Sequence, residues 1–571
     1  MINYKEKIAQ LLATAVEGLT VEELQNMIEV PADSKMGDYA FPCFKLAKVL
    51  RKAPPMIAKG IAEQIAADPM FEKVEQVNAY VNMFLSREVY VKDTVAEVIE
   101  KGDDFGRSDM GEGKKVIVEY SSPNIAKPFH IGHIRSTVIG NSIYKIYDFL
   151  GYDTMRINHL GDYGTQFGKM ICAYRRWGNK EDVINEPIKT LLSYYTKFHV
   201  EAEKDPSLDD EARAIFTRLE KGEPEEVDLW QWFRDESLKE FTRVYKMLGI
   251  EFDSYNGESF YSDKMPRFVQ ELKDAELLEE SEGAQIVNLE EYGMSPALIT
   301  KSDGSTLYIT RDIAAAVYRK ETYDFYKNIY VVASQQNLHF QQWIQIIELL
   351  GYDWARSCVH VPFGLVSLEE GTMSTRHGRV VFLEDVLNRA VEQTKVIIEE
   401  KGVATDNIEE TAAMVGIGAV MFQELSNNRI KDYTFSWDKV LNFEGETGPY
   451  VQYTHARAAS VLRKAGEEVV AKAAAGNIDA SYITSDSAYE LTKAIYEFPA
   501  VIVDAGEKYE PSVVTRHIVD VAQAFNKFYH DEHVLVDNED EKVAKVALVM
   551  AAKNTIKNGL ALLGIKAPEK M

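Results

Sequence analysis

Apolar positions along this chain follow two periods, and their order predicts its architecture. At the start, Ile8, Leu11, Leu12 and Val16 recur at the spacing of one helix face. Short apolar runs such as Val116–Tyr120 instead predict buried strands. Strand and helix patterns alternate through the middle of the chain, and the last part is almost wholly helical. This order predicts a parallel α/β sheet followed by a bundle of helices.

Shifts in this pattern divide the chain into three predicted domains. Residues 1–110 form a small α+β unit with one strand-like run, Val77–Leu85. Residues 111–411 alternate between strands and helices, except for a charged helical stretch at about 179–250 that we interpret as an insertion. Residues 412–571 form the helical part.

The insertion splits the predicted sheet in sequence. Val116–Tyr120 would be its first strand, because a turn and a helical pattern follow directly. The later runs that we expect to extend the sheet are Met155–Leu160, Thr306–Thr310, Ile329–Ser334 and Val359–Val366.

The turn after Val116–Tyr120 places two histidines at the start of a predicted helix. Free N–H groups and the positive end of the helix dipole make that position an anion site. His130 and His133 are three residues apart, hence on one face, where both can donate to the same phosphate. Gly132 between them lets a flat nucleobase approach the backbone. The pattern predicts a nucleotide-binding corner that stabilises charge developing on a phosphate.

Two other interpretations of this histidine pair stay open at this point. A His-x-x-His pair can bind a metal ion, but Ile131 and Gly132 stand where a zincin helix would carry a carboxylate. The pair could also be two surface histidines without a role. Because a long polar turn precedes it, we favour the nucleotide site and expect no metal site.

Composition narrows the cellular setting. Of 571 residues 46% are hydrophobic, and no run of 18 apolar residues or signal core occurs, so we expect a cytoplasmic protein without membrane contact. The three cysteines are far apart, which argues against disulfides and thiolate zinc sites: Cys43, Cys172 and Cys358. The formal charge of −26 speaks against nucleic acid only weakly, since net charge does not exclude a local basic track.

A second loop follows the last predicted strand of the sheet. Gly371–Arg379 contains two glycines, two arginines, a histidine and three hydroxyl side chains. A flexible cationic segment of this kind suits a triphosphate whose leaving pyrophosphate gains charge. Most loops of this composition are solvated turns, so its position downstream of a split α/β sheet matters more.

These motifs resemble those of class I aminoacyl-tRNA synthetases. His130–His133 reproduces their HIGH signature, and Thr372–Arg376 resembles a degenerate form of their KMSKS signature. Across essentially the whole chain the sequence resembles the arginyl-tRNA synthetase family. The runs that carry this resemblance are Ser122–Pro128, His159–Asp162, Tyr308–Asp312, Ala333–Gln336 and Tyr450–Arg457.

The resemblance implies a fold and a reaction. The fold would be a Rossmann-type parallel-sheet catalytic domain split by a helical insertion, with an N-terminal α+β domain that contacts tRNA and a C-terminal α-helical bundle that binds the anticodon. The reaction would be the ATP-dependent attachment of L-arginine to tRNA(Arg) through an arginyl-adenylate, with transfer to the 2′-hydroxyl of the terminal adenosine. Mg²⁺ would arrive with ATP, without a dedicated protein site, and we expect a monomer.

The resemblance also assigns roles to single residues. The catalytic residues would be His130, His133, Lys127 and Arg376. ATP would be bound by Gly132, His130, His133, His339, Met373, Ser374 and Arg376. Arginine would be bound by Glu119, Ser122, Asn124, His133, Tyr308, Asp312 and Gln336. tRNA would be contacted by Tyr80, Asn82, Tyr450, Tyr453 and Met571.

Two of these residues also follow from physical arguments. The lysines of KMSKS are replaced by Thr372 and Thr375, so we expect Lys127 to supply the missing cation; the alternative is a solvated surface charge. A buried guanidinium needs a carboxylate, and Asp312 can accept its planar fork; the alternative is an unliganded carboxylate near a helix start.

Three classes of rival function, the first of which is another class I synthetase, are less consistent with the residues. A cysteine-specific synthetase would need zinc ligands, and a glutamate-specific one a cationic pocket where Asp312 stands. A small nucleotidyltransferase would lack the N-terminal unit and the long helical part. A non-catalytic tRNA-binding relative would have lost a signature residue, but His130, His133 and Met373 are all present.

Overall fold

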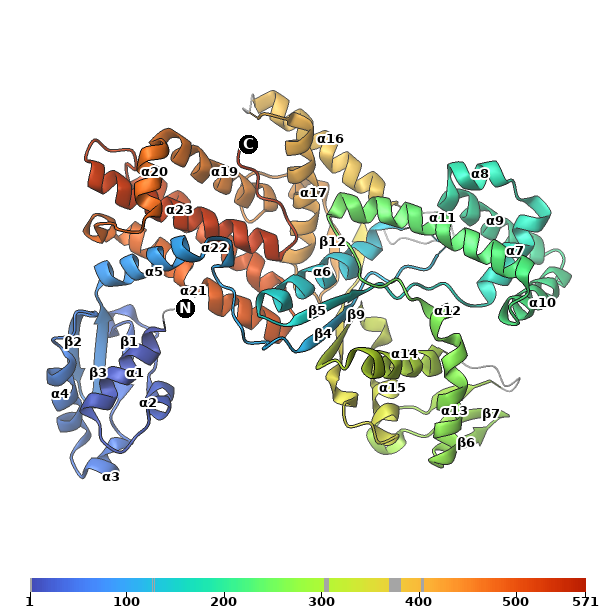
Figure 1. Cartoon of the computed structure of the whole chain (residues 1–571), viewed down its shortest axis with the longest axis horizontal. Helices are drawn as coiled ribbons and strands as arrows, with labels where there is room; N and C mark the ends of the chain where they lie inside the picture. Colours follow the sequence, from blue (N-terminus) through green and yellow to red (C-terminus); the bar gives the residue numbers. More distant parts are fainter. Residues whose placement is uncertain (1–2, 126, 128, 302–307, 369–380, 402–404) are drawn as a thin grey trace.

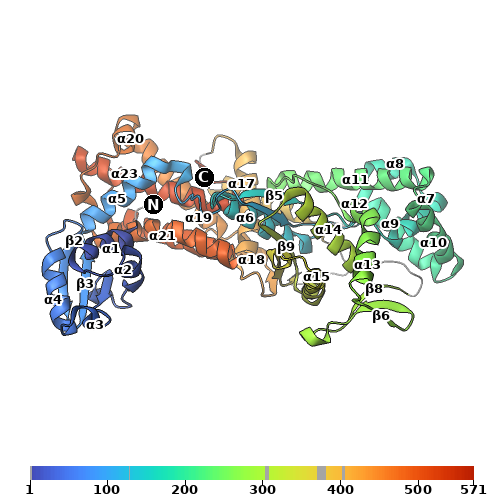
Figure 2. The same ribbon diagram turned by 60° about the horizontal axis from the view of Figure 1, so that its bottom comes forward.

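The computed structural model describes residues 3–125, 127, 129–301, 308–368, 381–401 and 405–571. The central parallel sheet lies in the middle of an elongated molecule (Figures 1 and 2). The small N-terminal unit lies at one end, and the inserted helices from α7 (Thr165–Trp177) to α10 (Ser207–Glu220) lie at the other.

The N-terminal unit is a three-stranded antiparallel sheet, order β1-β3-β2, packed with helices. The single strand expected at Val77–Leu85 is wrong: Asn78, with φ 55°, turns the chain between two strands. The turn leaves β2 and β3 paired as a hairpin. The elements are α1 (Tyr4–Ala15), α2 (Val21–Met27), β1 (Tyr39–Pro42), α3 (Leu46–Leu50), α4 (Pro54–Ile65), β2 (Phe71–Val77) and β3 (Tyr80–Leu85).

The central sheet has four parallel strands in the order β10-β9-β4-β5. Four consecutive buried positions in β4 confirm the buried strand expected at Val116–Tyr120. The strands are β4 (Lys115–Glu119), β5 (Asp153–Ile157), β9 (Lys327–Ala333) and β10 (Cys358–Phe363). Carboxyl ends of parallel strands meet at one edge, so the segments that follow β4, β5 and β9 converge there.

Helix α6 (Ile134–Phe149) connects β4 to β5 and packs directly on the sheet. Gly140 faces Tyr120 so closely that a Cβ at position 140 would lie 2.1 Å from the Cβ of Tyr120. Only glycine allows this approach of helix to strand. The N-terminal half of α6 therefore packs closely against the end of β4.

The strand expected at Thr306–Thr310 is wrong. Residues 302–307 lie outside the described part, and Tyr308 already begins helix α14 (Tyr308–Tyr323). Ile309, Ile313 and Val317 are all buried, four residues apart on one helix face. Their β-branched character favoured a strand locally, but the tertiary contacts of this face decide for a helix.

The expected insertion is helical throughout and extends further than its predicted bounds. It comprises α7 (Thr165–Trp177), α8 (Lys180–Asn185), α9 (Pro187–Ala202), α10 (Ser207–Glu220) and α11 (Pro224–Leu248). A second inserted part, which the hydrophobic pattern did not predict, follows before the chain returns to the sheet. It comprises α12 (Glu258–Tyr261), α13 (Met265–Asp274) and the antiparallel strands β6 (Leu278–Ser281), β7 (Ala284–Val287) and β8 (Ala297–Thr300).

The C-terminal part is a bundle of helices, as expected, apart from one short strand. Its elements, after α15 (Asn337–Leu349) and β11 (Val366–Leu368), are α16 (Leu383–Lys401), α17 (Ile408–Ser426), β12 (Tyr433–Phe435), α18 (Trp437–Val440), α19 (Gly448–Ala465), α20 (Glu467–Ala474), α21 (Asp486–Lys508), α22 (Ser512–Asp531) and α23 (Glu539–Leu562). Helix α5 (Arg87–Lys101) leaves the N-terminal unit and lies against α21 and α23 (Figure 1).

Among the described helices, none combines the length and the apolar composition that crossing a membrane requires.

Candidate active site

Two hydrogen bonds fix the state of the signature histidines. The backbone N–H of Gly132 donates to Nδ1 of His130 at 3.0 Å, and that of His130 donates to Nδ1 of His133 at 3.1 Å. Because a backbone N–H can only donate, both Nδ1 atoms act as acceptors in these bonds. Nδ1 of His133 also lies 3.3 Å from the carbonyl oxygen of His130, but that oxygen already accepts from the His133 N–H at 2.9 Å, so the shorter contact with the His130 N–H decides the role of Nδ1. The hydrogen of each neutral ring therefore lies on Nε2. The ring centroids are 4.0 Å apart, so the two rings form one compact pair of donors.

Both rings are neutral near pH 7. Burial lowers the pKa of His130, and burial also lowers the pKa of His133 to about 3, with the charges of His130 and Lys127 acting in the same direction. Phe129 stacks on the His133 ring with centroids 5.1 Å apart. A neutral ring with hydrogen on Nε2 is a hydrogen-bond donor without a full charge.

The turn that precedes the histidines has an unfavourable backbone conformation. Ser121 and Ser122 have φ values of 70° and 47°, a region that costs a non-glycine residue about 1–2 kcal/mol. Hydrogen bonds compensate for this cost: Ser121 N–H donates to Ser136 Oγ at 2.9 Å, and Ser121 Oγ lies 2.8 Å from the hydroxyls of Thr137 and Tyr245. Helices α6 and α11 thus hold the turn in place.

The second motif lies outside the described residues, and so do its predicted site residues Met373, Ser374 and Arg376. The segments directly before and after the second motif are described, and their contacts show where the chain leaves the central domain and where it returns. After it, Ile131 N–H donates to the carbonyl of Val381, and Leu383 N–H donates to the carbonyl of Phe129. Before it, strand β11 pairs with β12. The chain therefore returns from the second motif directly beside the histidines.

Lys127 lies close to the histidine pair. Its side chain is half-buried; burial lowers its pKa, and Glu258 has the opposite effect. Its charge contributes to the lowered pKa of His133, which is the effect of a nearby cation. Its partial burial distinguishes Lys127 from a fully solvated surface charge.

Glu258 is a neighbour of this site that the sequence did not indicate. It begins α12, and its carboxylate lies 3.0 Å from the guanidinium of Arg311. Burial raises the pKa of Glu258 to about 7, although Arg311 lowers it and the charges of Asp312 and Asp162 raise it further. No local sequence pattern marks it, because its neighbours come from segments about 50 to 100 residues away.

Asp312 lies in the first part of α14, four residues after Tyr308 and on the same helix face. Its carboxylate oxygen Oδ2 is 2.5 Å from Nε2 of His339, which follows β9 at the start of α15. Both side chains are partly exposed, Tyr308 is 58% exposed, and Gln336 is exposed in the turn before α15. Asp312 was predicted to bind arginine and His339 to bind ATP, and the structure places these two side chains in contact.

Glu119 ends strand β4 and is already paired. Its carboxylate lies 2.6 Å from Nη1 of Arg319, whose side chain is completely buried. Nη2 of Arg319 lies 3.3 Å from Nδ1 of His159, and His159 stacks on Tyr261. Arg319 was missed from the sequence, since an arginine inside a helical pattern indicates a surface position.

Asn124 is exposed in the turn after β4, and Ser122 is half-buried beside it. The backbone of Asn124 bridges to Gly161 in parallel. A Cβ at position 161 would lie 2.0 Å from Oδ1 of Asn124. Glycine at this position therefore leaves the amide of Asn124 in its present orientation.

Three family models together match nearly all of the chain. The model for the N-terminal domain of arginyl-tRNA synthetase matches residues 3–85. The model for the catalytic domain of class I tRNA synthetases (R) matches residues 94–437, and the DALR anticodon binding domain matches 451–571. The chain belongs to the arginyl-tRNA synthetase family.

Relatives of this family agree over the full length. The chain is 59% identical to the arginine–tRNA ligase of Clostridioides difficile and 57% identical to that of Halothermothrix orenii, over 571 residues and 100% of each chain. The fold is similar to that of Thermus thermophilus arginyl-tRNA synthetase (TM-score 0.80, 24% identity, 100% of both chains). It is also similar to the Plasmodium falciparum enzyme (TM-score 0.75, 25% identity, 100% of this chain and 99% of that one).

The protein is therefore a ligase that joins L-arginine to tRNA(Arg), and its class uses ATP. The predicted Rossmann-type catalytic sheet and helical C-terminal domain are confirmed.

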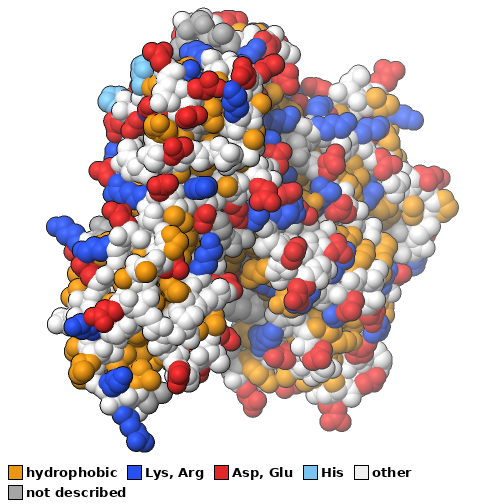
Figure 3. All heavy atoms as spheres, turned by 60° about the vertical axis from the view of Figure 1, so that its left-hand side comes forward, with side chains coloured by type: hydrophobic (Ala, Val, Ile, Leu, Met, Phe, Trp, Pro, Cys, Tyr) orange, Lys and Arg blue, Asp and Glu red, His pale blue; other side chains and the backbone are white. Residues whose placement is uncertain are grey.

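The two tRNA contacts predicted on the N-terminal unit of the synthetase differ in exposure. Tyr80 is half-buried, and the centroid of its ring lies 5.4 Å from the ring centroid of the exposed Phe44. Asn82 is only 1% exposed in the central strand β3, so the structure gives no support to a direct contact by Asn82. On the face that carries this unit, basic side chains are scattered among acidic ones (Figure 3).

The predicted anticodon residues of the synthetase lie on α19 and beside it. Tyr453 is 38% exposed, and the guanidinium of Arg457 covers its ring at 4.9 Å. The Tyr450 hydroxyl accepts from Asn526 Nδ2. The chain end is tied to the same helix, because Arg463 donates to the carbonyl of Glu569, two residues before Met571.

Proposed function

We propose that this synthetase attaches arginine to tRNA(Arg) in two steps, and that both steps take place at the carboxyl edge of its parallel sheet. In the first, a carboxylate oxygen of arginine attacks the α-phosphorus of ATP, and pyrophosphate leaves. In the second, the 2′-hydroxyl oxygen of the terminal adenosine attacks the carbonyl carbon of arginyl-adenylate, and AMP leaves. The observation that carries the proposal is the pair of Nδ1 acceptors, which leaves both Nε2 hydrogens of His130 and His133 available to one phosphate.

The chemistry asks for placement and charge stabilisation more than for covalent catalysis. Neutral donors that are already oriented need no reorganisation as charge grows on the pentavalent phosphate. Gly132 and His339 complete the proposed ATP site with Met373, Ser374 and Arg376. Mg²⁺ would be carried by the ATP phosphates, which suit its preference for phosphate oxygens and water.

Lys127 supplies the positive charge that the second motif lacks, because Thr372 and Thr375 replace the lysines of KMSKS. Its half-buried side chain and its electrostatic effect on His133 support this role. Together with Arg376 it would neutralise the β- and γ-phosphates.

Arginine would bind with its guanidinium at Asp312, between Tyr308 and Gln336. Its α-amino and carboxylate groups would be held by Asn124, His133 and Ser122. Glu119 would act beneath them as a second anionic group, although its pairing with Arg319 weakens its field at the substrate.

We infer a cytoplasmic monomer with three domains at 1–110, 111–411 and 412–571. The three cysteines support a reducing compartment, because all are buried free thiols. The first and third domains would contact tRNA, through Tyr80 in the first and through Tyr450, Tyr453 and Met571 in the third.

Substitution of Lys127 tests the proposal. Lys127→Ala should lower the rate of arginyl-adenylate formation by about 10²-fold while the Kd for tRNA(Arg) stays within about twofold. Lys127→Arg is the matched control and should retain more of the rate, because it keeps the charge. A loss of tRNA affinity alone would contradict the assigned role.

A further inference from the structure

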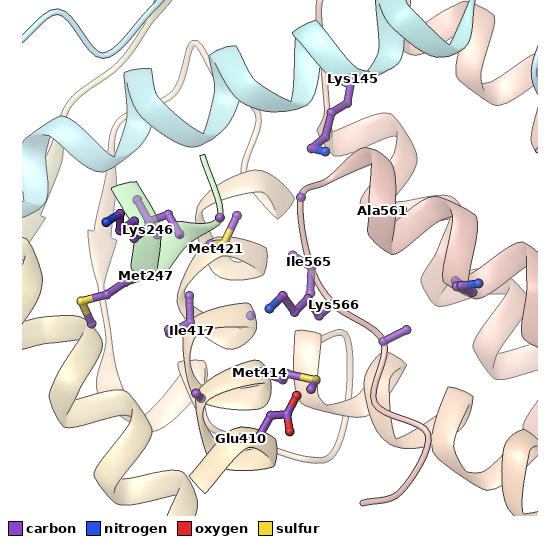
Figure 4. Close-up of a pocket in the computed structure, with 17 residues that line it drawn as sticks. Lys145, Lys246, Met247, Glu410, Met414, Ile417, Met421, Ala561, Ile565 and Lys566 are labelled. Carbon is purple, nitrogen blue, oxygen red and sulfur yellow. The ribbon is translucent and has the colours of Figure 1, made fainter. Parts of the chain in front are cut away.

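A cavity of about 600 Å³ lies outside the site described above, where the catalytic part meets the helical bundle. Its walls come from α6, the end of α11, α17, the end of α23 and the C-terminal tail (Figure 4). Apolar side chains, three of them methionines, form much of the lining: Met247, Met414, Ile417, Met421, Ala561 and Ile565. Methionine is flexible and polarisable, so such a surface adapts to a flat apolar group.

Three lysines reach this cavity from three different segments. Lys145 comes from α6, Lys246 from the end of α11 and Lys566 from the tail (Figure 4). None of the three has an ion pair with a described residue, whereas Lys557 on the rim is paired with Asp103. Among the described residues that line the cavity, Glu410 is the one that carries a carboxylate.

Lys246 and Lys566 are exposed, so water can solvate their ammonium groups, whereas Lys145 is more enclosed. Lys145 is half-buried, and burial together with the charge of Arg156 lowers its pKa while Asp148 opposes the shift. A half-buried ammonium without a partner is unfavourable unless an anion joins it. The lysines and the apolar lining together point to a ligand with an anionic and a flat apolar part.

We propose that this cavity binds a nucleoside phosphate, with the phosphate between Lys145, Lys246 and Lys566 and the base against the methionines. A phosphate offers several oxygens to ammonium groups from different directions, as this arrangement requires. The ligand can be an unstacked nucleotide of bound tRNA or a free nucleotide. The first source fits the location, because α23 and the tail with Lys566 belong to the part of the chain that matches the anticodon binding domain.

The test compares a triple variant, Lys145→Ala with Lys246→Ala and Lys566→Ala, with wild type. Lys273→Ala is the matched control, because Lys273 is exposed on α13, outside the cavity. The probes are a tRNA(Arg) transcript in filter binding and radiolabelled AMP in equilibrium dialysis, with the active site saturated by an arginyl-adenylate analogue. Circular dichroism and the thermal midpoint check that each variant is folded.

If the nucleotide belongs to tRNA, the triple variant should bind the transcript about tenfold more weakly and with a smaller salt dependence. If it is free, wild type should bind AMP at a site that the analogue does not block, and the triple variant should lose that site. Met414→Trp keeps the lysines but fills the apolar part, so it should reproduce the same loss. A triple variant that matches Lys273→Ala in both assays would overturn the proposal.

Discussion

The guanidinium of Arg135 and the carboxylate of Glu424 form a completely buried ion pair, with Nε 2.6 Å from Oε1. Arg135 lies two residues after His133 on α6, and Glu424 lies near the end of α17. The Tyr433 ring lies 5.1 Å from the guanidinium, and its hydroxyl donates to Glu424. Because Tyr433 belongs to β12, which pairs with β11, the pair links the histidine helix to the strand that leads into the second motif.

Removing one member of this pair should destabilise the enzyme strongly. Glu424→Leu or Arg135→Met leaves an unpaired charge in the interior, which costs about 3–5 kcal/mol. The double variant leaves no charge, so its thermal midpoint should lie above that of either single variant. Differential scanning calorimetry of the three proteins measures this. Additive losses would show that the two residues act independently.

Gly161→Ala should weaken arginine binding without unfolding the protein. The new Cβ would occupy the place of Asn124 Oδ1, and an exposed amide can turn away from it. Loss of one hydrogen bond of about 1 kcal/mol predicts a rise in the KM for arginine of about fivefold. Asn124→Ala should give a similar rise in steady-state aminoacylation. If Gly161→Ala leaves KM unchanged while Asn124→Ala raises it, the steric argument fails.

Asp312→Asn should impair arginine use and spare ATP binding. It replaces the carboxylate by a neutral amide of the same size, so the guanidinium loses its charged partner and the KM for arginine should rise about 10²-fold. His339→Ala distinguishes this role from a structural one, because Asp312 also pairs with His339. If His339→Ala changes the KM for arginine as much as Asp312→Asn does, Asp312 acts through that pairing instead of through the substrate.

The lowered pKa of His133 predicts a dependence of stability on pH. Its value is about 3 in the folded protein against 6.5 for the free side chain. The unfolded chain therefore takes up a proton below pH 6.5 that the folded protein does not. The stability contribution is present above pH 6.5 and is lost as pH falls toward 3, by about 2 kcal/mol at pH 5.

His133→Asn removes this group and keeps a polar side chain. Urea unfolding at pH 7.5 and pH 5 should show a smaller acid-induced loss in the variant than in wild type. Equal losses would mean that His133 titrates normally in the folded enzyme.

Local patterns predicted the elements whose residues are neighbours in sequence. The strand at Val116, the helix from Ile134 and the anion site between them follow from periodicity and helix-end chemistry alone. Tyr308 begins a helix although its neighbours are β-branched, because burial of one face decides the structure there. The hairpin β6-β7 is instead set locally, because Glu282 and Gly283 turn the chain with φ values of 51° and 79°, whereas β8 packs against α14.

The residues of the candidate site also fall into those that local sequence predicts and those that it does not. The proximity of the His130 and His133 rings was predictable, since residues three apart at a helix start share one face. Glu258 and Arg319 were not, because their significance comes from partners more than 50 residues away, Arg311 and Glu119 respectively. The sequence also could not predict the hydrogen bonds of the histidine rings, because the tautomer depends on which ring nitrogen faces a backbone N–H in the folded chain.

The most direct test of the central claim is the single-turnover rate of arginyl-adenylate formation in His133→Gln and His133→Asn. The amide nitrogen of glutamine reaches the position of Nε2, whereas that of asparagine reaches the position of Nδ1. If an Nε2 hydrogen stabilises the phosphate, His133→Gln should retain a rate within about tenfold of wild type and His133→Asn should lose about 10²- to 10³-fold. A faster rate in His133→Asn than in His133→Gln would contradict the account.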